Sequence, residues 1–257
     1  MQCIAIPIET NYCYLLNQIG STNVLVIDPS SVDEVVEVLR KHKFVPIGVI
    51  SCHHHRDHTC GALDICDLYD VPFYLPEKDI PSSELSSSSR LLAVQDASTL
   101  DLDDITVTIL ETPGHTTGAA CLYAVHHDQS FLFTSDTLFH CGMGRLFETS
   151  TQPQIMYNSL RKIKELPKGT LLHFGHDYAT KNLNFLKTIN ESLAMSRLNT
   201  LPSSMKERCC YPLGEEIRLN PFLKVDDPEF RDLIPGCSRD TEPVEALRVL
   251  RQMRDVY

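Results

Sequence analysis

Four histidines and one aspartate lie within six consecutive residues of this chain, at positions 53–58. Neutral imidazole nitrogens and carboxylate oxygens are the ligands that borderline divalent ions such as zinc prefer. In an extended segment, His53 and His55 occupy alternate positions and point the same way. Asp57 and His58 follow where the chain must turn toward the next element, so they can face a second ion. The run therefore predicts a metal site.

The segments on either side of this run predict where it lies in the fold. Phe44 to Ile50 is apolar and rich in branched residues, as buried strands are. We expect Thr59 to cap a following helix with Leu63, Cys66 and Leu68 on its apolar face. The histidines would then lie at the carboxyl end of a strand, where open sheets place their active sites. The alternative is a surface polyhistidine patch or a purification tag, but a tag lies at a terminus and contains no Asp-His pair.

Three later segments place another histidine or aspartate directly after an apolar run. His115 follows the alternating run from Ile105 to Leu110, and Asp136 and His176 each follow a further apolar run. Taken singly, each is more often structural, as a turn histidine, a capping aspartate or a core histidine. Four strand ends that each deliver such a side chain are hard to attribute to chance, so we expect these side chains to converge.

Periodicity predicts the remaining elements. We expect strands at Tyr12–Leu16, Val24–Asp28 and, as the last strand, Leu171–Phe174, and helices at Val32–Lys41 and Thr151–Leu166. Ser31 is the expected cap of the first helix. After Tyr178 the apolar period becomes helical, which marks a domain boundary.

The pattern H-x-H-x-D-H at 53–58, followed in order by His115, Asp136 and His176, resembles the metallo-β-lactamase superfamily. Several segments resemble one family within it, the glyoxalase II or hydroxyacylglutathione hydrolase family. These segments are Gly114–Gly118, Asp136–Phe139, Gly144–Glu148, Gly175–Tyr178, Asn220–Lys224 and Thr241–Val244. The resemblance covers nearly the whole chain. It implies an α/β (α+β) fold, with a four-layered αββα catalytic sandwich over residues 1–177 and a small helical, thiol-binding domain over residues 178–257.

The resemblance also implies a site for two divalent metal ions, zinc first, with iron or manganese as alternatives. Seven side chains would be ligands. His53, His55 and His115 would hold one ion, Asp57, His58 and His176 the other, and Asp136 would bridge them. Two ions roughly 3.5–4 Å apart share a water, lower its pKa and polarise a carbonyl. Asp57 would additionally orient the bridging hydroxide. We expect His173 to be a core residue, or one that contacts a ligand, rather than a ligand itself.

The activity that the resemblance implies is hydrolysis of S-(2-hydroxyacyl)glutathione. S-D-lactoylglutathione would give D-lactate and glutathione, the second step of methylglyoxal detoxification. Family members contact the glutathione carboxylates with basic residues at the positions of Arg145, Arg251 and Arg254. Tyr178 would supply a hydroxyl, and Phe147, which stands where some members have tyrosine, an aromatic wall. Without the resemblance, the arginines of the last helix would indicate only a solvated basic face.

Some positions depart from the family pattern and leave alternatives open. His140 and Cys141 stand near the bridging aspartate where smaller residues are more usual, and would narrow the site or add an oxidisable thiol. The thiol carrier could therefore be glutathione or another low-molecular-weight thiol. An alternative enzyme is a persulfide dioxygenase of the same superfamily, which uses one iron and fewer of these ligands and lacks a helical region with Arg251 and Arg254. A noncatalytic metal- or thiol-binding protein is the alternative from another class.

Composition narrows the partners and the compartment. The 257 residues carry a formal net charge of -11, which disfavours nucleic acid as a partner and a nuclease activity. The ten cysteines are scattered, and the vicinal pair Cys209-Cys210 is too isolated from other cysteines to indicate a metal site. Free thiols predict a reducing compartment. Since the sequence shows neither a secretory signal nor a membrane-spanning run, we expect a cytoplasmic monomer with a small-molecule substrate and no membrane partner.

Overall fold

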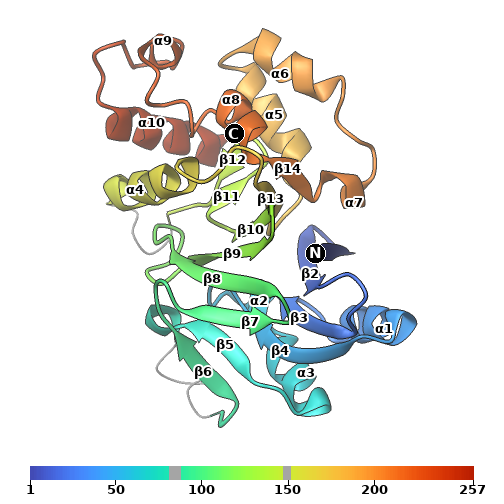
Figure 1. Ribbon diagram of the computed structural model, residues 1–257. Coiled ribbons are helices and arrows are strands. Elements are labelled where there is room, and N and C mark those ends of the chain that lie inside the picture. Colours follow the sequence, from blue (N-terminus) through green and yellow to red (C-terminus); the bar gives the residue numbers. More distant parts are fainter. Residues whose placement is uncertain (81–87, 147–151) are drawn as a thin grey trace.

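A computed structural model describes residues 1–80, 88–146 and 152–257 of the chain. Within these residues, two six-stranded sheets pack face to face (Figure 1). The first sheet runs in the order β1 (Gln2–Ile8), β2 (Asn11–Asn17), β3 (Asn23–Ile27), β4 (Val45–Ile50), β5 (Phe73–Pro76) and β6 (Leu91–Val94). The second runs in the order β14 (Cys210–Pro212), β13 (Leu171–Phe174), β10 (Gln129–Ser135), β9 (Ala120–His126), β8 (Ile105–Glu111) and β7 (Thr99–Leu102).

Three apolar clusters define four layers. Between the two sheets lies a cluster that includes Tyr14, Ile50 and Phe133. The outer face of the first sheet packs on α1 (Asp33–His42) and α3 (Ala62–Tyr69), which bury side chains such as Leu39 and Ile65. The outer face of the second sheet packs on α4 (Pro153–Lys164) and on helices of the C-terminal region. The αββα sandwich is therefore confirmed.

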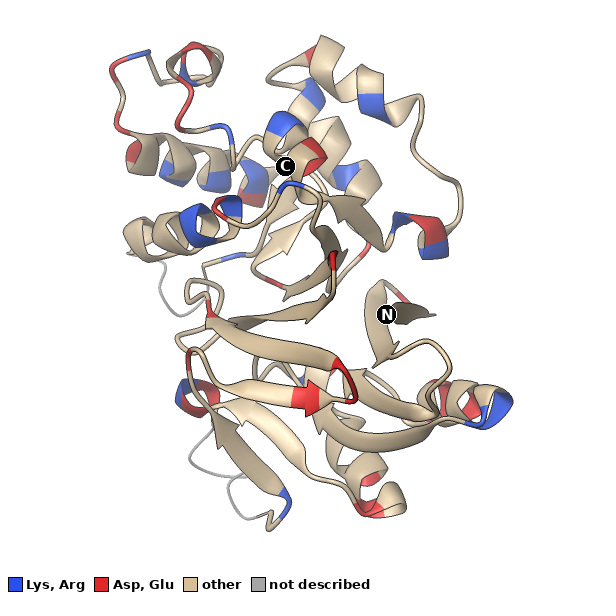
Figure 2. Ribbon diagram, viewed as in Figure 1, with Lys and Arg blue, Asp and Glu red and all other residues tan. Residues whose placement is uncertain are grey.

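The C-terminal region is mainly helical and lies against α4 and the second sheet (Figure 1). It contains α5 (Ala179–Lys187), α6 (Glu191–Leu198), α7 (Met205–Arg208), α8 (Leu213–Leu219), α9 (Pro228–Arg231) and α10 (Pro243–Val256). Most lysines and arginines of the chain fall in this region and on α4 (Figure 2). No helix in the described ranges is both long and apolar enough to cross a bilayer.

The prediction that Leu171–Phe174 is the last strand is wrong. β14 follows it and pairs antiparallel with β13, so that His173 lies opposite Cys210. β14 has only three residues and ends in proline, so its sequence shows no alternation of apolar and polar residues. Pairing with β13 makes this segment a strand.

Two predicted helix caps are also wrong. The segment after the histidines forms two helices, α2 (Arg56–Thr59) and α3, and Thr59 ends the first of them, where its hydroxyl donates to the His55 carbonyl at 3.1 Å. Leu68, expected on the apolar face, is exposed. Val32 rather than Ser31 occupies the N-cap position of α1, and the Ser31 hydroxyl contacts the Glu34 carboxylate.

Candidate metal centre and its pocket

Three histidines from two strand ends form the first group of candidate ligands. His53 and His55 follow β4, and His115 follows β8; their donor atoms all lie within 4.8 Å of one another. His115 Nδ1 lies 2.9 Å from the Arg145 carbonyl oxygen and donates to it, since a carbonyl can only accept. The other ring nitrogen of His115, Nε2, lies 3.0 Å from His55 Nδ1. His53 Nε2 is buried and makes no hydrogen bond within the described residues. This orphaned nitrogen fits a metal ion.

A second group lies beside the first. Asp57 and His58 stand in α2, His176 follows β13, and their donor atoms also fall within 4.8 Å of one another. Nε2 of His58 lies 3.2 Å from Nε2 of His176, which is 3.4 Å from Asp57 Oδ2. The opposite nitrogen, His58 Nδ1, faces Asp28 Oδ2 at 3.2 Å, which orients the ring.

Asp136, directly after β10, lies between the two groups. Its Oδ1 is 3.2 Å from His58 Nε2 and 3.3 Å from His176 Nε2, and its Oδ2 is 3.5 Å from His115 Nε2. Gly175 packs so closely that a Cβ there would lie 2.7 Å from Asp136 Oδ1. The carboxylate thus reaches both groups.

The electrostatics of the site fit a cation. Burial opposes protonation of His58, but the carboxylates of Asp136 and Asp28 raise its pKa well above the usual value. For His176, burial also opposes protonation, yet Asp136 and Asp57 raise its pKa to about 9. Burial lowers the pKa of His53 well below its usual value, which keeps this imidazole neutral. The carboxylates therefore attract positive charge, which a divalent ion supplies, and the neutral imidazole is ready to coordinate it.

One cavity of about 340 Å³ joins this centre to the C-terminal region. It is lined by His55, Asp57, His115, Asp136, Phe139, Met143, Arg145, His176, Tyr178, Lys181, Asn182, Arg251 and Arg254. The Tyr178 ring stacks on His176, with centroids 4.9 Å apart. Phe147, the predicted aromatic wall, lies outside the described residues.

The arginines of the last helix occupy different environments. Arg251 is 6% exposed and donates to the Met143 carbonyl at 2.8 Å; burial lowers its pKa to about 10, so it stays charged at neutral pH. Arg254 is 8% exposed and donates through Nε and Nη2 to Asn182 Oδ1 at 3.1 Å. Only Arg248, paired with Glu245 on the surface, fits the alternative of a solvated basic face.

His140 and Cys141 do not line this cavity, so the expectation that they narrow it or add a reactive thiol is wrong. They form the turn between β11 (Leu138–Phe139) and β12 (Gly142–Met143), and they are buried against α8. Glu216 contacts His140 Nδ1 and accepts from the Cys141 backbone N–H at 3.0 Å, while Arg197 Nε donates to His140 Nε2 at 3.1 Å. Burial raises the Cys141 pKa well above its usual value, which makes the thiol inert.

Two buried aspartates of the site were missed in the sequence. Asp28 accepts from the Cys52 backbone N–H at 2.8 Å and from the Ser135 hydroxyl at 2.6 Å, besides facing His58. Asp79 accepts from the His54 backbone N–H at 3.0 Å and from Gly118 N at 2.6 Å, which ties the two histidine loops together. The signal for Asp28 was its place at a strand end; a three-residue turn of 3₁₀-helix carries Asp79 and gives no comparable signal.

Comparison with known proteins agrees with this geometry. The sequence profile of the metallo-beta-lactamase superfamily matches residues 7–176, and that of the hydroxyacylglutathione hydrolase C-terminus matches residues 177–257. The hydroxyacylglutathione hydrolase of Methylobacillus flagellatus is 32% identical over 97% of this chain and 96% of its own, and that of Edwardsiella ictaluri is 32% identical over 100% of both.

Solved structures share the fold at lower identity. A metallo-beta-lactamase from Staphylococcus aureus aligns with a TM-score of 0.71 and 18% identity, over 100% of this chain and 72% of its own. TTHA1623 in a di-iron-bound form aligns with a TM-score of 0.63 and 21% identity, over 87% of this chain and 100% of its own. On the two profiles and the full-length relatives, this chain belongs to the metallo-beta-lactamase superfamily and, within it, to the hydroxyacylglutathione hydrolase family.

Proposed function

We propose that this protein hydrolyses S-(2-hydroxyacyl)glutathione thioesters, with S-D-lactoylglutathione as substrate and D-lactate and glutathione as products. The observation that carries the proposal is the cavity whose lining includes both the His and Asp groups and Arg145, Arg251 and Arg254. A thioester carbonyl can lie beside the His and Asp groups while the anionic groups of glutathione lie beside the arginines. The relatives named hydroxyacylglutathione hydrolase support this assignment.

The site would take two divalent ions, with zinc proposed ahead of iron and manganese for a mixed nitrogen and oxygen donor set. The proposed ligands are His53, His55 and His115 for one ion, Asp57, His58 and His176 for the other, and Asp136 for both. A neighbour of the same fold is described in a di-iron-bound form, which supports a two-metal site. Bound ions would supply carbonyl polarisation and a water activated at neutral pH.

The chain's own groups would position the reacting molecules. Asp57, held by Asn11 Nδ2 at 3.3 Å from its Oδ2, lines the cavity and would orient the attacking water. The leaving thiol has a pKa of about 8.5, so no strong general acid is required. Arg145 at the exposed rim and the buried Arg251 and Arg254 would bind the glutathione carboxylates.

Tyr178 and Phe147 are the proposed uncharged contacts. Tyr178, whose ring stacks on His176, would offer its hydroxyl to the substrate. Phe147 would supply an aromatic wall. We further propose the division of the chain at residue 177 into catalytic and substrate-binding domains, and a monomeric enzyme of the cytoplasm.

The proposal is tested by steady-state hydrolysis of S-D-lactoylglutathione with protein of known metal content, before and after chelation. Turnover that chelation abolishes and zinc restores is the expected result. Metal-loaded protein that hydrolyses lactoyl thioesters of other small thiols but not this one would overturn glutathione as carrier. Oxygen uptake with glutathione persulfide, in place of hydrolysis, would identify the dioxygenase alternative, and metal binding without either activity the noncatalytic one.

A further inference from the structure

A second group of candidate metal ligands lies outside the cavity. The donor atoms of His173, Cys209 and Cys210 all fall within 4.8 Å of one another, and none of the three residues lines the cavity described above. His173 stands on β13, and Cys210 lies directly opposite it on the edge strand β14. This chemistry is distinct from that of the hydrolase site, because it combines one nitrogen with two sulfurs.

His173 is an unexplained polar group in the core. It is 4% exposed, and neither of its ring nitrogens has a hydrogen-bond partner within the described residues. Its ring packs on Phe133 and Phe131, with centroids 4.9 and 5.0 Å away. Burial lowers its pKa to about 3, so the imidazole is neutral and its lone pair is available. Buried polar atoms are nearly always satisfied, so this imidazole calls for a ligand.

The neighbouring thiols can supply the remaining donors. Cys209 is 7% exposed and Cys210 is half-buried, so the group borders solvent at the sheet edge. The hydrogen bond between the two thiols lowers the pKa of Cys210, which favours its thiolate, and raises the pKa of Cys209. Cys3 on β1 packs against the same apolar cluster as Cys209 and Cys210.

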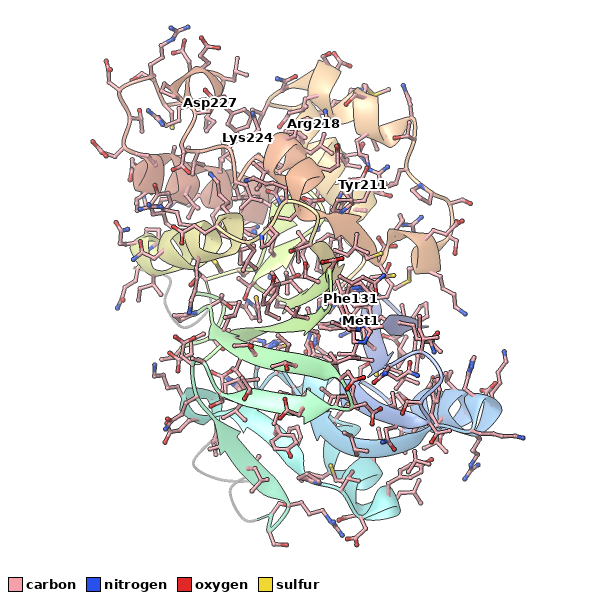
Figure 3. The ribbon with its side chains drawn as sticks, in the orientation of Figure 1. Met1, Phe131, Tyr211, Arg218, Lys224 and Asp227 are labelled. Atoms are coloured by element: carbon pink, nitrogen blue, oxygen red, sulfur yellow. The ribbon has the colours of Figure 1, made fainter. Side chains whose placement is uncertain are left out.

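The backbone around these residues is held in place from several directions. The Phe174 N–H donates to the Cys209 carbonyl at 3.2 Å, and the Tyr14 hydroxyl lies 3.1 Å from the same carbonyl. Arg208, one residue before Cys209, donates through Nε to both Asp177 oxygens, at 3.0 and 3.2 Å. Phe131, whose ring contacts His173, belongs with Met1 to the apolar cluster between the two sheets, and both residues are labelled in Figure 3. Such a frame pre-organises a site.

We propose that His173, Cys209 and Cys210 bind one thiophilic divalent ion such as Zn²⁺ or Cd²⁺. Two thiolates balance the charge of such an ion, as a buried site requires. The vicinal cysteines, which looked isolated in the sequence, gain their partners through the fold. The bound ion would hold β14 of the C-terminal region against β13.

The test is titration of the reduced protein with Cd²⁺ or Co²⁺, followed by ultraviolet absorption. None of the seven ligands proposed for the hydrolase site is sulfur, so a sulfur-to-metal charge-transfer band cannot come from that site. We expect the band to saturate at one thiolate-bound ion per chain. Reduced protein that takes up ions without this band would overturn the proposal, as would finding these thiols only as a disulfide that, once reduced, binds no Cd²⁺.

Cysteine variants show which thiols produce the charge-transfer band. The double variant Cys209→Ser/Cys210→Ser should lose it, whereas Cys237→Ser, a partly buried cysteine elsewhere, should keep it. A band that survives in the double variant contradicts the assignment. If that variant does not fold, alkylation of the wild-type protein decides: Cd²⁺ should protect Cys209 and Cys210 from modification and leave Cys60, which is exposed, unprotected. Equal modification of all three with and without Cd²⁺ would refute the site.

Discussion

At the scale of single residues, the candidate ligands are oriented by partners on the nitrogen that faces away from the centre. His115 uses the Arg145 carbonyl at 2.9 Å, and His58 uses Asp28 at 3.2 Å. Such partners fix the tautomer and the direction of the ligand nitrogen. Asp28 also accepts from Ser135 and from the Cys52 backbone, so one carboxylate supports several residues of the site.

We expect Asp28→Asn to weaken metal binding about 10- to 100-fold, because an amide has one acceptor oxygen and cannot serve all these donors. Competition with a chromophoric chelator measures the affinity directly. Asp33→Asn, on the exposed start of α1, is the matched control and should leave the affinity unchanged. Unaltered binding in Asp28→Asn would show that this carboxylate does not support the centre.

The backbone and the side chain of Arg145 have different roles. Its carbonyl orients His115, whereas its side chain is 58% exposed at the cavity rim. Arg145→Ala should therefore raise KM for S-D-lactoylglutathione about three- to tenfold, the effect of losing an exposed charged contact, and leave the metal content intact. Arg248→Ala serves as the control, since Arg248 pairs with Glu245 outside the cavity. A fall in metal content, or equal KM values for both variants, would contradict the assigned role.

The convergence of the candidate ligands could be predicted from the sequence, because the segments that carry them follow strands and the carboxyl ends of strands meet. Asp79 and Glu216 could not be predicted, since the partners described above lie 25 to 39 and 75 to 76 residues away and only tertiary packing brings them together. The proximity of His173 to Cys209 and Cys210 could not be predicted either, because the sequence around His173 indicates only a core residue.

At the scale of elements, the segment from β11 to Gly144 connects the centre to the C-terminal helices. A Cβ on Gly144 would collide with the Asp136 carbonyl and lie 3.1 Å from His115 Nδ1. The turn itself is fastened from the other side by Glu216 and by Asn220, whose Nδ2 donates to the Gly142 carbonyl at 3.0 Å. Element packing therefore transmits any displacement of this segment to two candidate ligands.

Gly144→Ala should accordingly displace Asp136 and His115 and lower metal affinity or turnover about 10- to 100-fold. Metal analysis of the purified variant is the measurement. Gly169→Ala provides a comparison, because a Cβ there meets nothing within 4 Å. If both variants retain full metal content and activity, the close packing of Gly144 has no functional consequence.

Glu216→Ala should lower the free energy of unfolding by about 3–5 kcal/mol, because it leaves His140 and the Cys141 N–H buried without their partner. Denaturant unfolding of metal-loaded protein measures this. Glu215→Ala is the control, because Glu215 pairs with Arg218 on the surface. It should lower the free energy of unfolding by less than about 1 kcal/mol. Similar losses for the two variants would show that the buried network adds no stability.

Elements with many residues of one period were predictable. The helix α1 differs by one residue at each end from the predicted helix Val32–Lys41, and α4 falls within the predicted helix. Short elements were not: α2 and β14 contain four and three residues, and both depend on contacts with distant segments.

At the scale of the whole molecule, the cavity joins two stretches of sequence that each match a different profile. Residues 7–176 contribute all seven candidate ligands, whereas residues 177–257 contribute Arg251, Arg254 and Tyr178. The order of the motifs along the sequence predicted that the candidate ligands come before residue 177 and that Arg251, Arg254 and Tyr178 come after it. The cavity itself, and the burial of both arginines within a chain of net charge -11, required the fold.

The most direct test of the account is turnover of S-D-lactoylglutathione as metal is returned stepwise to chelator-stripped protein. Any sulfur-bound ion is counted separately by its charge-transfer band. We predict no hydrolysis by stripped protein and maximal hydrolysis once two further ions are bound per chain. Hydrolysis by the stripped protein, or none by the fully loaded protein, would contradict the central claim that the His and Asp centre performs thioester hydrolysis.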